Sequence, residues 1–151
     1  MAENIYTDIG YHSLVMRINA LTEYSAPHWG KMDLPQMLEH CAIQLKMALG
    51  ILPNTIEGSP LLYRTLVGRW LSLYVVPWPR GFETPAIMDM LTNNMPVQDF
   101  ENEKTHLLFL LKEIRKETTL APHHFYGDIS KKDWGRLIWV HLDHHLRQFG
   151  Q

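Results

Sequence analysis

Apolar side chains recur along this chain at intervals of three and four residues, which is the period of an amphipathic α-helix. The clearest stripe lies in residues 34–49 and consists of Leu34, Met37, Leu38, Cys41, Leu45, Ala48 and Leu49. Asp33 and Gln36 have the spacing of a capping box, so we expect this helix to begin near Asp33. No run of five or more residues alternates between apolar and polar side chains with turn residues at its ends, so we expect no strands.

The same spacing predicts helices elsewhere in the chain. An early helix is indicated by Ile5, Ile9, Val15, Ile18 and Leu21. Others are expected from Ser59-Pro60 to just before Pro77, over 97–117, and from Ser130, with Asp133 at a capping-box position, to Phe149. These lengths fit an all-α helical bundle, and 151 residues fit a single domain spanning residues 1–151.

Residues 76–96 form a long Pro-rich connection between two of the predicted helices. Its prolines are Pro77, Pro79, Pro85 and Pro96. Loops beyond roughly 12–15 residues are uncommon in compact domains and often act as lids over functional sites. The alternative is a loop that packs over one end of the bundle, with a short extra turn of helix at 87–91.

Charge and composition exclude several classes of partner. The formal net charge is −2, without a basic patch for nucleic acid or a polybasic membrane stripe. The most apolar stretch, 61–76, contains two arginines and is shorter than the about 20 residues that a membrane span needs. The single cysteine, Cys41, forms no internal disulfide and belongs to a core stripe, which predicts an inert buried thiol. The N-terminus has no signal-peptide pattern, so we expect a cytoplasmic protein.

The nine histidines are the most informative polar residues. His141 and His145 are four residues apart and share one face of the last predicted helix. The inward stripe of that helix is Trp134, Leu137, Ile138, His141, His145 and Phe149. Both imidazoles therefore stand where an apolar residue is expected, and their burial is costly unless each has a partner. A shared metal ion would be that partner; the alternative is two core histidines that are hydrogen-bonded to backbone or carboxylate groups.

His40 is the candidate for a third ligand, because it borders the apolar stripe of residues 34–49. On pattern alone it could equally be a polar residue with an ordinary hydrogen bond. Three protein ligands leave a coordination position open, as in catalytic zinc sites. We expect a divalent metal, with Zn or Ni first and Fe, Cu or Mn as alternatives. Acceptors for the second ring nitrogens could be Glu39, Gln44, Asp143 or Gln148, although Asp143 points away from the His141 and His145 face and is expected in an ion pair or in solvent.

The other histidines carry weaker signals. His144 could compete with His145, and His123 and His124 follow Pro122 in a turn that could border a pocket. His106 and Glu103 form one Glu-x-x-His motif, whereas a di-iron bundle needs two such motifs and further glutamates. The candidates for a pocket or for ligand support are Gln44, His124, His144 and Gln148. Motifs for nucleotide cofactors, serine hydrolases and zincins are absent, and no catalytic residue is assigned.

Two blocks of sequence, one toward each end of the chain, are specific enough to be compared with known families. The first block comprises Trp29-Gly30-Lys31-Met32 and Gln36-Met37-Leu38-Glu39-His40-Cys41. The second comprises His123-His124-Phe125-Tyr126-Gly127, Trp134-Gly135-Arg136-Leu137 and His141-Leu142-Asp143-His144-His145-Leu146-Arg147-Gln148-Phe149. These blocks resemble the DinB-like superfamily and, within it, a branch of unknown function. The resemblance implies a four-helix bundle with up-down-down-up connectivity and a divalent metal held by His40, His141 and His145. Many members carry Arg-Gly-Gln beside the last histidines, whereas Leu146-Arg147-Gln148 follows His145 here.

Characterised relatives in that superfamily imply thiol transfer with low-molecular-weight bacterial thiols, related isomerase chemistry, or hydrolysis. The resemblance also implies a homodimer. Three hypotheses follow. The protein is a metal-dependent transferase or hydrolase of a small molecule, or a non-catalytic binding or stress-associated module with a structural or vestigial metal site, or a helical interaction protein without metal.

Overall fold

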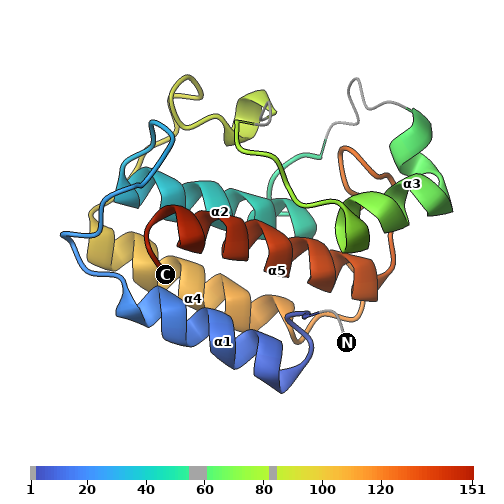
Figure 1. Ribbon diagram of the computed structural model, residues 1–151, viewed down its shortest axis with the longest axis horizontal. Coiled ribbons are helices and arrows are strands. Elements are labelled where there is room, and N and C mark those ends of the chain that lie inside the picture. Colours follow the sequence, from blue (N-terminus) through green and yellow to red (C-terminus); the bar gives the residue numbers. More distant parts are fainter. Residues whose placement is uncertain (1–2, 55–60, 82–84) are drawn as a thin grey trace.

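The computed structural model describes residues 3–54, 61–81 and 85–151. Four long helices lie side by side: α1 (Asp8–Ala20), α2 (Leu34–Ala48), α4 (Phe100–Ile114) and α5 (Lys131–Gln148) (Figure 1). Within the described ranges there is no strand, only an isolated bridge between His123 and Gly127. The predicted all-α bundle is confirmed.

The directions of the four helices explain the long connection in the middle of the chain. α1 and α5 run one way, and α2 and α4 run the other way, which is the up-down-down-up arrangement (Figure 1). Because α2 and α4 are parallel neighbours, the chain between them must return along the length of the bundle. That connection carries η1 (Leu61–Arg64), α3 (Leu66–Trp70), η2 (Leu71–Val75) and η3 (Ala86–Met88).

Side-chain caps determine where the long helices begin. The Asp33 carboxylate accepts a hydrogen bond from the Gln36 backbone N–H, and the Gln36 side chain accepts one from the Asp33 N–H, so the predicted capping box of α2 is present. α4 begins later than predicted, because Asp99 caps it. Ser130 caps α5. Asp133 stands at the capping-box position, but its carboxylate accepts a hydrogen bond from the Tyr74 hydroxyl and so links α5 to η2.

The prediction of a single helix from Ser59-Pro60 to just before Pro77 is wrong. Ser59 and Pro60 lie outside the described residues, and the remainder is divided into η1, α3 and η2. The break has a local cause, because the Thr65 side chain accepts from the Gly68 N–H and starts α3 as a new helix. Leu66 and Trp70 are exposed, so their helical spacing does not mark a core face. The same holds for Ile9 in α1, which is 83% exposed.

The main core lies between the four long helices. It contains Leu14 and Ile18 from α1, Leu38, Cys41 and Leu45 from α2, Leu107 and Leu111 from α4, and Trp134, Ile138 and Leu142 from α5. Burial raises the pKa of the Cys41 thiol well above its usual range, which agrees with an inert core residue. None of the described helices is long and apolar enough to cross a membrane.

A second, smaller core fixes the Pro-rich connection to α2. Met88 and Met90 from the connection pack against Ile43 and Met47 on the face of α2. The predicted short turn of helix is present as η3, slightly earlier than expected. In this part the connection is a packed loop, and one of its backbone carbonyls contacts a histidine of α2.

Candidate metal centre

Three histidines from two helices converge inside the bundle. His40 comes from α2, and His141 and His145 lie one turn apart on α5. Their ring centroids are 4.8 Å apart for His40 and His141, 4.6 Å for His40 and His145, and 4.7 Å for His141 and His145. One nitrogen of each ring lies within 4.8 Å of the other two. All three side chains are buried.

The ring of His145 is oriented by a side chain from the next turn of α5. The Gln148 amide nitrogen donates to the Trp29 carbonyl at 2.5 Å, so the amide oxygen Oε1 faces the other way. That oxygen lies 2.8 Å from His145 Nδ1 and accepts its hydrogen. Because Nδ1 carries the hydrogen, the lone pair of His145 is on Nε2, the nitrogen that a metal ion would use.

The ring of His40 is oriented by the Pro-rich connection. Its Nδ1 donates to the Met88 carbonyl at 2.8 Å, which leaves the lone pair on Nε2. His40 Nε2 lies 2.9 Å from His141 Nε2. Sequence reasoning missed Met88, because any residue type can supply a backbone carbonyl.

His141 is the one ligand candidate whose second nitrogen has no acceptor. Its Nδ1 is buried without a hydrogen-bond partner among the described residues, and the Trp78 ring packs on the imidazole with centroids 5.9 Å apart. The nearby Gln44, one turn after His40 on α2, also has a buried Oε1 without a described partner. Unsatisfied buried polar atoms are uncommon in folded proteins, and an ordered water or a bound ion is a common reason for one.

Burial keeps the three imidazoles neutral. It lowers the pKa of His40, lowers that of His141 well below its usual value, and lowers that of His145 to about 3. The neighbouring histidines add to this effect in His141 and His145, since a charge on one ring disfavours a charge on the next. Neutral imidazole is the form that binds metal ions. The donor set and burial of the three residues, together with the tautomers of His40 and His145, therefore fit one divalent cation.

Comparison with known proteins adds a family. The family model described as "Protein of unknown function (DUF1569)" matches residues 6–151, nearly the whole chain. The chain belongs to this family. No curated protein and no solved structure matches it.

The Trp29-Gly30 block of this DUF1569 protein supports the three-histidine group by holding Gln148. Gly30 has φ +85°, and a Cβ atom there would lie 2.3 Å from Gln148 Nε2. Glycine therefore lets the chain pass close to Gln148 while the Trp29 carbonyl holds its amide. The His28 N–H also donates to the Gln148 carbonyl, so two hydrogen bonds join this turn to the end of α5.

The His123–Gly127 block has a structural place in the DUF1569 fold. His123 Nδ1 accepts hydrogen bonds from the backbone N–H groups of Phe125 and Tyr126, and its ring packs on Trp134. His124 lies against His123, with ring centroids 4.2 Å apart, and not among the three converging rings. His144 also stands outside that group: its ring packs on His145 and on Trp29.

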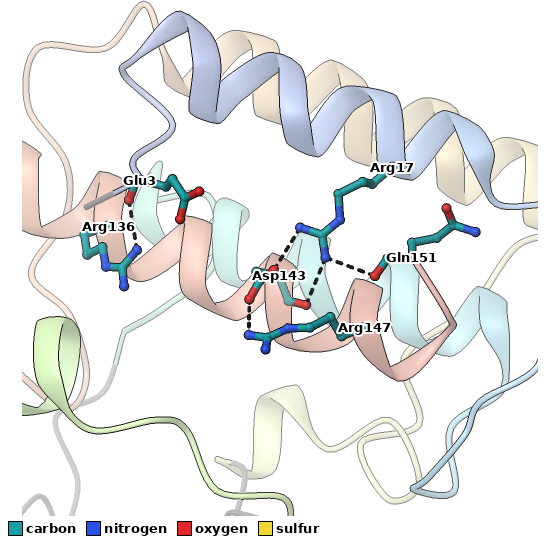
Figure 2. A network of polar contacts seen from close by, with 6 residues as sticks. All are labelled: Glu3, Arg17, Arg136, Asp143, Arg147 and Gln151. Atoms are coloured by element: carbon teal, nitrogen blue, oxygen red, sulfur yellow. Dashed lines mark hydrogen bonds and ion pairs between the residues drawn. The ribbon is translucent and has the colours of Figure 1, made fainter. Parts of the chain in front are cut away.

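Asp143 lies on the other side of α5 and joins it to α1. Its carboxylate accepts from Arg17 of α1 at 2.8 Å and from Arg147 one turn later on α5. Arg17 also donates to the Gln151 carbonyl, while Arg136 donates to the Glu3 carbonyl (Figure 2). The ion-pair role predicted for Asp143 is confirmed, and a role as acceptor for a ligand histidine is not.

A cavity of about 780 Å³ adjoins the histidine group. Trp78, which packs on His141, and His144, which packs on His145, both line it. The rest of the wall combines aromatic rings such as Trp29 and Trp139, aliphatic side chains, and charged residues that include Arg80 and Arg147. Its volume is in the range of pockets that hold small molecules.

Proposed function

We propose that His40, His141 and His145 bind one divalent metal ion and that this DinB-like protein is a metal-dependent enzyme acting on a small molecule. The proposal rests on three buried, neutral imidazoles whose nitrogens converge within 4.8 Å. Thiol transfer is the first candidate reaction, and hydrolysis is the second. Zn²⁺ and Ni²⁺ are the first candidate metals for an all-imidazole site, followed by Fe²⁺ and Mn²⁺.

The metal and the protein have separate tasks in this proposal. A divalent ion with three neutral ligands supplies Lewis acidity at a further coordination position. Gln148 and the Met88 carbonyl hold His145 and His40 in the tautomer that presents Nε2. Trp78 and Met88, both from the Pro-rich connection, cover the histidines and limit the access of water.

The cavity favours a small substrate with an anionic group. The Arg80 guanidinium lies 4.1 Å from the centroid of the Trp29 ring and makes no ion pair with the described residues. Arginine on an aromatic face is well placed to bind a carboxylate or phosphate. The indole rings of Trp78 and Trp139 offer apolar surface beside it. A low-molecular-weight thiol that carries a carboxylate fits this combination.

The test uses metal-free protein reconstituted separately with Zn²⁺, Ni²⁺, Fe²⁺ and Mn²⁺. Each form is assayed for conjugation of carboxylate-bearing thiols to an electrophile and for hydrolysis of ester and amide substrates. We expect turnover with at least one metal, and its loss in His141→Ala. The exposed His12→Ala is the matched control and is expected to keep the activity. Turnover that is independent of metal, or unaffected by His141→Ala, would contradict the proposal.

One observation favours a second candidate, a non-catalytic protein with a structural metal ion. None of the three histidines lines the cavity, because Trp78 and His144 lie on that side. If this candidate holds, reconstituted protein contains one metal ion and melts at a higher temperature than metal-free protein, yet all of the assays above are negative.

The homodimer stays a prediction, which light scattering of the purified protein checks.

A further inference from the structure

A second group of potential metal ligands lies between α2 and α4. Glu39 of α2 is buried, and so is Glu103 of α4. His106, one turn after Glu103, is partly exposed, with 37% of its side chain accessible. One atom from each of these three residues lies within 4.8 Å of the other two. The Glu-x-x-His motif of α4 is therefore completed by a glutamate from the neighbouring helix.

Each glutamate has one oxygen that is already engaged. Glu39 Oε1 accepts from the Lys46 ammonium at 2.7 Å, and Glu103 Oε1 accepts from the Gln98 backbone N–H at 2.7 Å. Glu103 Oε2 is buried and has no hydrogen-bond partner among the described residues. Glu39 Oε2 lies 4.0 Å from His106 Nδ1. Carboxylate and imidazole ligand atoms of these three residues thus lie in one compact group.

The charges at this point are not balanced by the protein alone. Two carboxylates face one ammonium, from Lys46, which leaves one negative charge in a mostly buried place. Burial raises the pKa of Glu103, and the neighbouring Glu39 raises it further through its negative charge and through a side-chain hydrogen bond. A divalent cation would stabilise both carboxylates in their charged forms; a proton shared between them is the competing solution.

We propose that Glu39, Glu103 and His106 form a second divalent-cation site, independent of the three-histidine centre. Two carboxylates and one imidazole suit Mn²⁺ or Fe²⁺ better than the all-nitrogen set does. The exposed side of His106 gives the cation a route from solvent and leaves room for water ligands. Lys46 competes with the cation for Glu39, so the site binds more weakly than it would without that ammonium.

The test is a titration of metal-free, full-length protein with Mn²⁺, followed by electron paramagnetic resonance of the free ion. We expect one bound Mn²⁺ per chain at this site. Glu103→Gln, which keeps the acceptor for Gln98, weakens binding by at least about tenfold. His106→Ala does the same at a partly exposed position where folding is not at risk. Glu101→Gln, an exposed glutamate on the same helix, is the matched control and leaves binding unchanged.

Two further variants separate this site from its alternatives. Lys46→Gln removes the competing ammonium and is expected to tighten Mn²⁺ binding. His141→Ala disrupts the three-histidine centre but leaves this Mn²⁺ site intact, so failure of one proposal is distinguishable from failure of the other. The second site is refuted if neither the wild type nor Lys46→Gln binds Mn²⁺, which is the result expected when the two carboxylates share a proton. It is also refuted if Glu103→Gln binds Mn²⁺ as tightly as Glu101→Gln.

Discussion

Gln148 Oε1 accepts a hydrogen bond from His145 Nδ1 at 2.8 Å, while the amide nitrogen of the same side chain donates to the Trp29 carbonyl. One residue thereby fixes both the rotation and the tautomer of a candidate metal ligand. Because Trp29 lies in the turn before α2, the same contact joins the two ends of the sequence that carry the family blocks.

Gln148→Ala is expected to weaken metal binding by roughly 10- to 100-fold, because His145 loses the acceptor that holds its Nδ1 hydrogen. Zn²⁺ affinity measured by competition with a chromophoric chelator checks this. Lys132→Ala, at an exposed position of the same helix, is the control and should bind like the wild type. Equal affinities in the two variants would show that Gln148 does not support the ligand.

Gly30→Ala is expected to cost more stability than Gly50→Ala. Both glycines have positive φ, +85° and +71°, so both variants carry a backbone penalty of about 1 kcal/mol. Only at position 30 would the new Cβ meet another group, Gln148 Nε2, which adds roughly 1–3 kcal/mol of steric cost. Urea unfolding of the two metal-free variants measures the difference. Indistinguishable midpoints would mean that the turn can move away from Gln148.

Metal-free protein is expected to lose stability as the pH falls below about 6.5, the ordinary pKa of histidine. His40, His123, His141 and His145 have lowered pKa values in the folded protein because they are buried, so the unfolded chain binds more protons than the folded one at mildly acidic pH. Each such histidine lowers the unfolding free energy by up to about 1.4 kcal/mol per pH unit until its folded pKa is reached.

Urea unfolding with a chelator at about pH 7.5 and at about pH 5.5, roughly one unit above and one unit below the ordinary pKa of histidine, checks this dependence. His123 needs its neutral form for a further reason, since its Nδ1 accepts two backbone hydrogen bonds. An unfolding free energy that stays constant over this interval would contradict the burial of neutral imidazoles.

Asp143→Asn is expected to destabilise the protein by about 1–3 kcal/mol, because the mostly buried Arg17 loses its charged partner between α1 and α5. Arg147→Gln should cost less than about 1 kcal/mol, since 65% of the Arg147 side chain is exposed. Thermal unfolding gives both values. Metal affinity should be unchanged in each, because Asp143 does not contact the three histidines; a large loss of affinity in Asp143→Asn would assign it a role at the metal centre.

The parts of the fold that were predictable are those with a strong local signal. The stripe of α2 and its Asp33–Gln36 capping box located that helix correctly, and histidines at core positions of α5 indicated the place of the centre. The convergence of His40 with His141 and His145 required the resemblance to a known family as well, since a single sequence does not show which faces of two distant helices meet.

The parts that were missed depend on contacts without a residue-type signal. The Met88 carbonyl could not be anticipated, because backbone acceptors are present at every residue. The break of the predicted third helix comes from the Thr65 cap, which competes with the apolar spacing around it. The pairing of Glu39 with the Glu-x-x-His motif depends on the packing of α2 against α4, which the sequence does not determine.

The most direct test of the metal centre is the metal content of untagged protein, compared with that of a His141→Ala/His145→Ala variant, by elemental analysis after purification and reconstitution with Zn²⁺. We expect about one tightly bound Zn²⁺ per chain in the wild type and almost none in the double variant, with both chains helical by circular dichroism. Equal zinc content in the two proteins, or none in either, would contradict a three-histidine metal centre.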